Sequence, residues 1–233
     1  MRKYSALFTI ISFLFLFESC TKDTGYTDTK LSYSIKTTNL SASLKSNSAE
    51  SGVVATPNSN GSINWTSASI NFDQVDFIST HGGVTTTQIF KNLYFPNALK
   101  DSVSGSLNIF TGLYENINFV LKISESADNP PILIKGNYIE TSGTSIPVEV
   151  RLNLNQSFTF KNDNVEIKSG TYVAKITVEL NNLVKGLTAA DFGQTIRTGA
   201  NNTIVINSTL NNALLVKLLI NLKSCLSLKV VQQ

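Results

Sequence analysis

Apolar and polar residues alternate over several stretches of the chain, and alternation with a period of two predicts half-buried β-strands. In the longest example, five apolar residues from Ile146 to Leu154 are separated by single polar residues. Similar runs occur at 31–35, 117–123, 132–139, 172–180 and 204–206. Strands with turn residues between them and no alternation of strands with helices predict a mainly β fold, an antiparallel β-sandwich.

Two stretches predict helices instead. Thr188 followed by Asp191 is a capping box, which predicts a short helix that Gly193 limits. Between about 209 and 226, leucines at every fourth position predict a longer helix with Ser208 as its N-cap. These leucines are Leu210, Leu214, Leu218 and Leu222. Because apolar residues cover more than one face, we expect this C-terminal helix to be largely buried, against an open sheet end or a partner.

The N-terminal residues have the features of an export signal. Met1-Arg2-Lys3 is basic, and an apolar run from Tyr4 to Phe17 follows. A membrane-spanning helix needs about 20 apolar residues, so this shorter run predicts a secretory signal peptide, with a buried core helix as the alternative. We therefore divide the chain into a signal peptide at 1–19, a flexible tether at 20–30 and a β-sandwich domain at 31–233. A stretch rich in Ser, Asn, Ala and Gly predicts a loop or linker at about 41–61.

The segment Phe17-Glu18-Ser19-Cys20 resembles the lipobox of bacterial lipoproteins, in which cleavage precedes a cysteine that then carries lipid. Ser19 and Cys20 fit the pattern, whereas the family prefers Leu in place of Phe17 and a small residue in place of Glu18. The resemblance implies that Cys20 is lipidated and anchors the protein to the bacterial cell envelope, at the outer membrane, facing the periplasm or the surface. Ordinary secretion, with Cys20 free or paired with Cys225, is the alternative.

The charge content argues against a nucleic-acid partner. Charged residues make up 15% of the chain, below the roughly 25% of an average soluble domain. The 19 basic and 16 acidic residues leave a net charge of +3 and form no long basic run. Together with the lipobox, the β-rich region at 60–233 resembles the surface and periplasmic β-sandwich lipoproteins of Gram-negative bacteria. Some of these are fimbrillin-like, and some capture glycans.

Side chains that support catalysis are scarce. The only histidine, His81, precedes two glycines, and this context predicts a solvated hairpin turn rather than a general base. One histidine and two cysteines make no zinc-binding pattern, so we expect no metal and no cofactor. A change of phase at Asp73-Gln74, typical of a β-bulge, would bring Asp73 and Asp76 to one face, although solubilising strand-edge acids are commoner than catalytic pairs. Asn162-Asp163-Asn164 has oxygens suited to calcium, but its composition favours a plain hairpin turn.

These observations predict a lipid-anchored, non-enzymatic β-sandwich protein with a structural or binding role at the cell envelope. The first alternative is a surface glycan-binding lipoprotein, because Trp65, Tyr94 and Tyr114 are aromatic residues that can stack on sugar rings. The second alternative is a fimbrial or adhesin-type assembly subunit, which a removable terminal strand or an exposed open groove would favour. The membrane, through the lipid, and a glycan or an envelope protein are therefore the expected partners.

Overall fold

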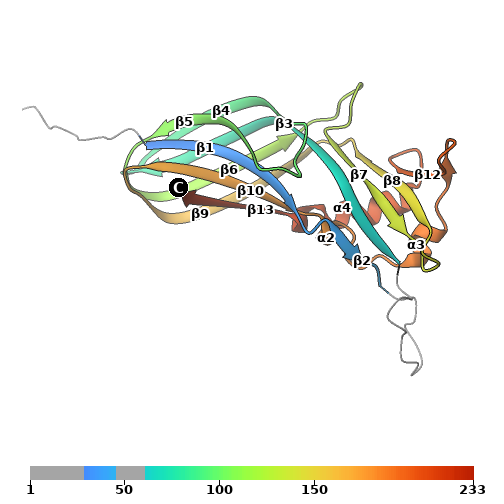
Figure 1. The fold of residues 1–233 in the computed structure, drawn as a ribbon. Coiled ribbons are helices and arrows are strands. Elements are labelled where there is room, and N and C mark those ends of the chain that lie inside the picture. Colours follow the sequence, from blue (N-terminus) through green and yellow to red (C-terminus); the bar gives the residue numbers. More distant parts are fainter. Residues whose placement is uncertain (1–28, 46–60) are drawn as a thin grey trace, which may run out of the picture.

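The computed structural model describes residues 29–45 and 61–233, which form a mainly β fold of two sheets packed together (Figure 1). The smaller sheet has the strand order β13-β10-β1-β5. Its strands are β1 (Thr29–Thr38), β5 (Ser102–Ile109), β10 (Thr171–Glu179) and β13 (Leu226–Gln232). The predicted signal peptide and Cys20 lie outside the described residues.

The larger sheet has the order β11-β12-β8-β7-β3-β6-β9, and β2 and β4 also pair with β3. Its strands are β2 (Ser41–Ser43), β3 (Ser62–His81), β4 (Val84–Phe95), β6 (Gly112–Ile123), β7 (Ile132–Ile139), β8 (Ser145–Leu152), β9 (Gln156–Ile167), β11 (Arg197–Thr198) and β12 (Thr203–Ile206). The first half of β3 pairs with β2 and β7, and its second half pairs with β4 and β6. The larger sheet therefore faces the smaller one at one end of the molecule and extends past it at the other (Figure 1).

Both sheets are mixed, which corrects the prediction of a purely antiparallel sandwich. In the smaller sheet β1 runs parallel to β10, and in the larger sheet β12 runs parallel to β8. The other paired strands are antiparallel. Alternation with a period of two records which face of a strand is buried, but it carries no information about the direction of the neighbouring strand.

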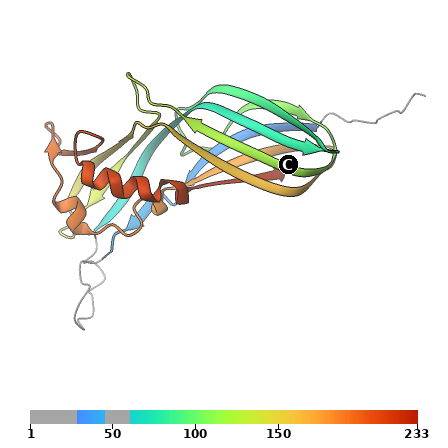
Figure 2. The same cartoon turned by 180° about the vertical axis from the view of Figure 1, so that it is seen from behind.

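The helices α2 (Leu180–Leu183), α3 (Ala189–Gly193) and α4 (Asn212–Cys225) lie at the extended end (Figure 2). The predicted capping box is confirmed, because the Thr188 side chain accepts a hydrogen bond from the Asp191 N–H and the Asp191 carboxylate accepts one from the Thr188 N–H. This arrangement satisfies two N–H groups that a helix start otherwise leaves without partners.

Helix α4 lies within the predicted range, but three details of the prediction are wrong. Its N-cap is Asn211, in a left-handed conformation, rather than Ser208, and Leu210 precedes the helix. The helix is also not largely buried, since the side chain of Ile220 is 76% exposed and that of Val216 is 50% exposed. The body of the protein contacts only one side of α4, where Leu214, Leu215, Leu218, Leu222 and Cys225 are buried.

Several predicted boundaries also move. Thr29 and Lys30, placed in the tether, begin β1, and Ser41–Ser43, placed in the loop, form β2. The predicted turn at 162–164 lies inside β9, where Asn164 takes a left-handed conformation without breaking the pairing with β6. Strands β4, β11 and β13 were not predicted.

The change of phase at Asp73-Gln74 is real, but it does not mark a β-bulge between β3 and β4. The register of these two strands is the same before and after Asp73. At this point β3 instead exchanges one neighbour for another, from β7 to β6. The side of β3 that is buried changes because the surroundings of the strand change.

The core lies between the two sheets and continues under the helices. Aromatic side chains occupy the space between the sheets, where the Tyr33 ring meets the rings of Phe90 and Phe119 at centroid distances of 5.0 and 6.1 Å. Under α2 and α4 the core is aliphatic and includes Leu183, Leu218 and Leu222. The described chain thus has one continuous core, with a tightly filled extended end and a more open opposite end.

Candidate functional site

A cleft of about 490 Å³ opens at the end of the molecule where the β3–β4 hairpin lies. It is lined by residues from the second half of β3, the first half of β4, the end of β5 and the start of β6. These residues are Phe77, Ser79, His81, Gly82, Val84, Thr86, Gln88, Asn108, Ile109, Phe110 and Tyr114. A volume of about 300–1,000 Å³ is typical of small-molecule sites, so this cleft is the candidate functional site.

The local sequence explains the shape of the hairpin that borders the cleft. His81 pairs with Val84, and the two residues between them, Gly82 and Gly83, have φ angles of +58° and +75°. Two successive residues in this region make the tight turn whose twist matches that of the flanking strands, and glycine adopts it without steric cost. The hairpin was predicted from these glycines, and the structure confirms it.

Inward-facing polar side chains line one wall of the cleft. Ser79 of β3 is opposite Thr86 of β4, and their hydroxyl oxygens are 3.1 Å apart, within hydrogen-bonding distance. In the next inward-facing pair, Gln88 of β4 is opposite Phe77 of β3. The wall therefore offers hydroxyl and amide groups beside apolar rings, a combination that fixes the orientation of a partly apolar ligand.

Another part of the lining is an aromatic pair. The His81 and Tyr114 rings are 4.9 Å apart between centroids and tilted by 33°. The Tyr114 hydroxyl donates a hydrogen bond of 3.0 Å to the carbonyl oxygen of Phe110. Burial raises the pKa of Tyr114, and the hydrogen bond to Phe110 opposes this effect only in part. A Cβ atom on Gly112 would overlap His81 Nε2, so the histidine is held in place by its surroundings and is not a freely solvated turn residue.

No acidic, lysine or arginine side chain is among the residues that line the cleft. Glu115 of β6 lies beside the hairpin turn, where its exposed carboxylate accepts a hydrogen bond from the Gly83 N–H. A buried charge without a partner is costly, so a cleft of this kind favours an uncharged ligand. Within the described ranges, no three His, Cys, Asp or Glu residues lie close enough to hold a metal ion.

The three aromatic residues singled out from the sequence do not come together. Tyr114 lines the cleft and is only 3% exposed. Trp65 is 4% exposed and packs over Gly136, where a Cβ atom would overlap the backbone of the neighbouring strand. Tyr94 lies on the outer face of β4 and is 60% exposed. No continuous row of exposed aromatic rings joins these three side chains.

The acidic pair Asp73 and Asp76 is split between different partners. The Asp73 carboxylate accepts a hydrogen bond from the Ser124 hydroxyl, whereas Asp76 makes an ion pair of 2.8 Å with Lys122. Burial favours the protonated form of Asp76, but hydrogen bonds from Lys122 and Gln74 outweigh it and lower the pKa of the carboxyl group. Asp76 is therefore a structural acid that is neutralised within the sheet.

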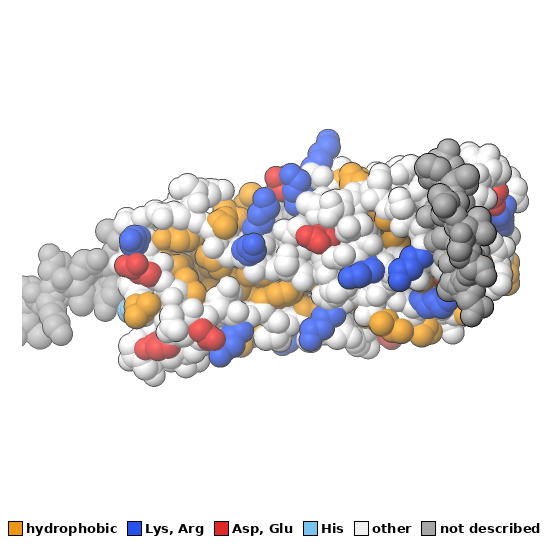
Figure 3. Space-filling model, turned by 90° about the horizontal axis from the view of Figure 1, so that it is seen from below, with side chains coloured by type: hydrophobic (Ala, Val, Ile, Leu, Met, Phe, Trp, Pro, Cys, Tyr) orange, Lys and Arg blue, Asp and Glu red, His pale blue; other side chains and the backbone are white. Residues whose placement is uncertain are grey.

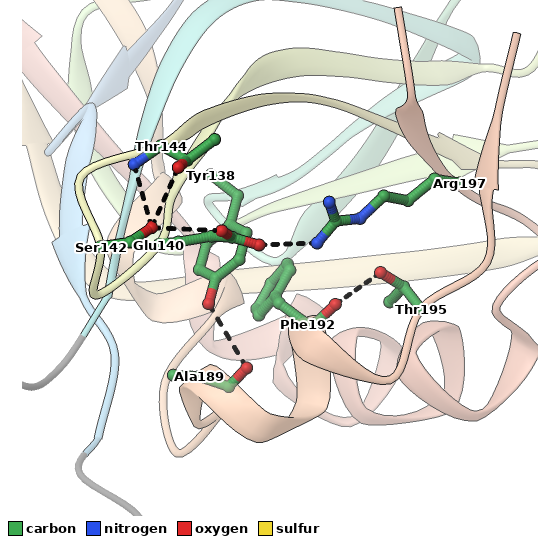
Figure 4. A network of polar contacts seen from close by, with 8 residues as sticks. All are labelled: Tyr138, Glu140, Ser142, Thr144, Ala189, Phe192, Thr195 and Arg197. Carbon is green, nitrogen blue, oxygen red and sulfur yellow. Dashed lines mark hydrogen bonds and ion pairs between the residues drawn. The ribbon is translucent and has the colours of Figure 1, made fainter.

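A second polar cluster (Figure 4) lies around β7 and α3, at the opposite end of the molecule (Figure 1). There the Tyr138 ring stacks on Phe192 of α3, with centroids 4.9 Å apart, and its hydroxyl donates to the Ala189 carbonyl oxygen at 3.4 Å. Glu140 and Arg197 form an ion pair of 2.6 Å beside these rings. Burial and the nearby Glu140 charge raise the pKa of Tyr138, while Arg197 opposes this. Each group already has a partner, so the cluster ties the β7–β8 hairpin to α3.

Sequence reasoning missed the polar wall of the cleft. Thr86 and Gln88 lie in β4, a strand that was not predicted, and Ser79 gave no distinct signal. The one available clue was the Gly82-Gly83 turn. A turn of two glycines predicts a second strand that pairs back onto β3, and that strand would have placed Thr86 opposite Ser79.

Comparison with known proteins adds no name to this site. No family model matches the chain, and neither a curated protein nor a solved structure matches it. Among the described residues, no helix is both long and apolar enough to cross a membrane.

Proposed function

We propose that this protein is a lipid-anchored, non-enzymatic binding protein of the bacterial cell envelope, and that the cleft bordered by the β3–β4 hairpin takes its ligand. The observation that carries the binding role is the cleft of about 490 Å³, lined by hydroxyl, amide and aromatic groups without acidic or lysine and arginine side chains. Such a lining suits a small, uncharged, partly apolar molecule. The anchor at Cys20 rests on the lipobox resemblance alone.

A fluorescent probe can test the cleft. N-phenyl-1-naphthylamine is an uncharged aromatic amine that becomes fluorescent in apolar surroundings, and we expect the mature chain to bind it. Thr86→Trp, which fills the cleft from β4, should weaken binding at least about tenfold. The matched control is Thr87→Trp, because Thr87 is the next residue on β4, is exposed and does not line the cleft. Equal probe binding by both variants would contradict a binding role for this cleft.

Competition experiments separate the main proposal from the glycan-binding alternative. The partly buried His81 ring borders the cleft and can stack on a sugar, whereas Tyr114 is only 3% exposed and Trp65 and Tyr94 lie elsewhere. If neutral oligosaccharides displace the probe from the wild-type protein, the ligand is a glycan. If alkyl glycerols displace it and oligosaccharides do not, the ligand is an uncharged amphiphile.

An assembly subunit remains a second candidate, because one specific feature favours it. Viewed from below, the molecule has a hollow lined by hydrophobic side chains along the side where β9 and β13 lie (Figure 3). Each of these strands ends its sheet, and Phe160, Val165 and Val230 pack only partly against the core. Unpaired strand edges beside apolar side chains can accept a strand from another chain.

The two residues Val230 and Val231 provide a matched test of this candidate. Val230 is partly buried against the core, whereas its neighbour Val231 points to the other face of β13 and is 41% exposed. If the protein assembles through this side, Val230→Glu should reduce the mass measured by light scattering, and Val231→Glu should not. A wild-type protein that stays monomeric at high concentration would contradict self-assembly.

A further inference from the structure

The end of the molecule that holds the cleft mouth also carries exposed apolar side chains. We call this end the tip, and define it by the hairpin turn at 82–83, the segment at 110–113 and the start of β1 at Thr29. We propose that the tip rests on the lipid surface to which Cys20 is anchored, so that the cleft opens toward the bilayer. This inference rests on the proposed lipid anchor and adds an interaction surface to it.

The first observation is the exposure of large apolar residues at positions where the chain turns. Val84 is 64% exposed, Leu113 is 60% exposed and Phe110 is 52% exposed. Turns at the end of a sheet normally carry polar residues, and exposed apolar side chains that gather there favour burial against another surface. Val84 and Phe110 also line the cleft, so the apolar surface of the tip continues into its mouth.

The second observation is where the described chain begins. Strand β1 starts with Thr29 at the tip, close to the β3–β4 hairpin (Figure 1). Eight residues, 21–28, separate Thr29 from Cys20. Even fully extended, a segment of this length spans at most about 3.6 Å per residue, or roughly 29 Å. A lipid on Cys20 therefore keeps the tip within reach of the bilayer surface.

The charges around the tip balance and do not require an anionic membrane. Lys30 and Lys168 are exposed there, and so are Glu115 and Glu166. The Lys168 ammonium and the Glu166 carboxylate are 3.7 Å apart. Because opposite charges accompany the apolar residues, the attraction comes from burying Val84, Leu113 and Phe110 among lipid head groups.

The exposed apolar residues of α4 are less suitable for contact with the membrane. Val216, Leu219 and Ile220 form an exposed stripe on α4. This helix lies at the end of the molecule opposite Thr29, as both ribbon views show (Figures 1 and 2). A short tether attached at the tip brings the tip to the membrane before α4. The α4 stripe therefore serves as the control surface.

The test uses the lipidated full-length mature protein in phosphatidylcholine vesicles. Leu113→Cys and Ile220→Cys are each labelled with an environment-sensitive fluorophore, while the buried Cys225, whose pKa burial raises to about 12, stays unreactive. We expect the label at position 113 to shift to shorter wavelength and to be quenched severalfold by nitroxide lipids. The label at position 220 should show neither effect. Quenching only at position 220, or at neither position, would overturn the proposal.

Separate variants distinguish failure of the anchor from failure of the tip contact. Cys20→Ser should release the protein from vesicles in a sedimentation assay, because a few apolar side chains hold a protein only weakly. If Cys20→Ser remains bound and Val84→Ser with Leu113→Ser releases it, the tip binds lipid but the anchor proposal fails. The alternative result is a shift of the label at position 113 to shorter wavelength without vesicles, by an amount that grows with protein concentration. That result would show contact with a second copy of the protein and would contradict the proposed contact with lipid.

Discussion

The two ends of the molecule each hold a pair of aromatic rings in close contact, with different consequences. His81 and Tyr114 lie at the tip, and Tyr138 and Phe192 lie at the extended end, with the same centroid distance of 4.9 Å. Helix α3 and the Glu140–Arg197 ion pair close over the second pair, whereas a cleft of about 490 Å³ lies beside the first. Tyr114 and Tyr138 are equally buried, each 3% exposed, so the difference lies in their partner rings: Phe192 is 1% exposed, whereas His81 is only partly buried and borders the cleft.

The largest difference between the two ends should appear on truncation of the rings. Phe192 is 1% exposed, so Phe192→Ala leaves a cavity and should lower the free energy of unfolding by about 3–5 kcal/mol. His81 borders an existing cleft, and His81→Ala should cost less than about 1 kcal/mol. Urea denaturation measures both. Equal losses would mean that the tip is packed as tightly as the extended end.

A second prediction concerns the glycine that accommodates His81. Gly112 has a φ angle of +138°, and a Cβ atom there would overlap the imidazole. We expect Gly112→Ala to lower the free energy of unfolding by about 1–3 kcal/mol. In the double variant with His81→Ala, the overlap is relieved and only the backbone strain remains, so part of the loss should be recovered. A strictly additive double variant would show that the histidine is not confined by this contact.

A third prediction uses the pH dependence of stability at the extended end. Burial opposes ionisation of Asp191, but hydrogen bonds from Lys217 and Thr188 outweigh it and lower the pKa of the carboxyl group below its unfolded value. The stabilisation is thus present above about pH 4 and is lost as the pH falls through the lower, folded-state pKa.

Asp191→Asn removes the titrating group and weakens the capping box. The substitution should lower the free energy of unfolding by about 1 kcal/mol at pH 7 and by less at pH 3. Urea denaturation midpoints at the two pH values measure the difference. Asp163→Asn is the control, because Asp163 is 54% exposed by its side chain and pairs with Lys161 on the surface. A larger cost of Asp191→Asn in acid than at neutral pH would contradict the assigned direction of the shift.

The smallest effect is expected from the ion pair beside the closed aromatic pair. The Arg197 and Glu140 side chains are 35% and 28% exposed, and such partly exposed pairs contribute about 0–1 kcal/mol. Arg197→Ala should therefore change the unfolding free energy by less than about 1 kcal/mol, and salt should reduce the effect further. A loss close to that of Phe192→Ala would mean that the ion pair, rather than ring packing, closes this end.

Strands that have one face on the core were predicted well. Strand β7 occupies the expected 132–139, and β10 and β12 lie where the apolar alternation placed them. Strand β4 was missed because its inward positions Thr86 and Gln88 face the cleft instead of a packed core. Strand β13 was missed because it begins at Leu226, directly after the last residue of α4, and no turn marks the boundary between helix and strand.

Some residues of the candidate site were likewise found from the sequence, and others were missed. Tyr114 was proposed from its aromatic character, and the hairpin that borders the cleft was predicted from Gly82 and Gly83. Ser79 and Gln88 are common polar residues whose significance depends on the side chains opposite them. Trp65 was singled out as an aromatic in the same way, but it is buried over Gly136 on the neighbouring strand and does not line the cleft. Sequence alone does not show which strand lies beside a given ring.

Local interactions were decided by the sequence itself. The spacing of Thr188 and Asp191 determined a helix start, two glycines determined a hairpin, and the period of two determined most strands. These features depend on backbone geometry and on which face of an element is apolar, and both are properties of neighbouring residues. The tertiary structure decided the direction of β1 against β10, the exposed side of α4 and the position of the cleft. Each of these depends on contacts between segments far apart in the chain, and alternation along a single strand does not encode them.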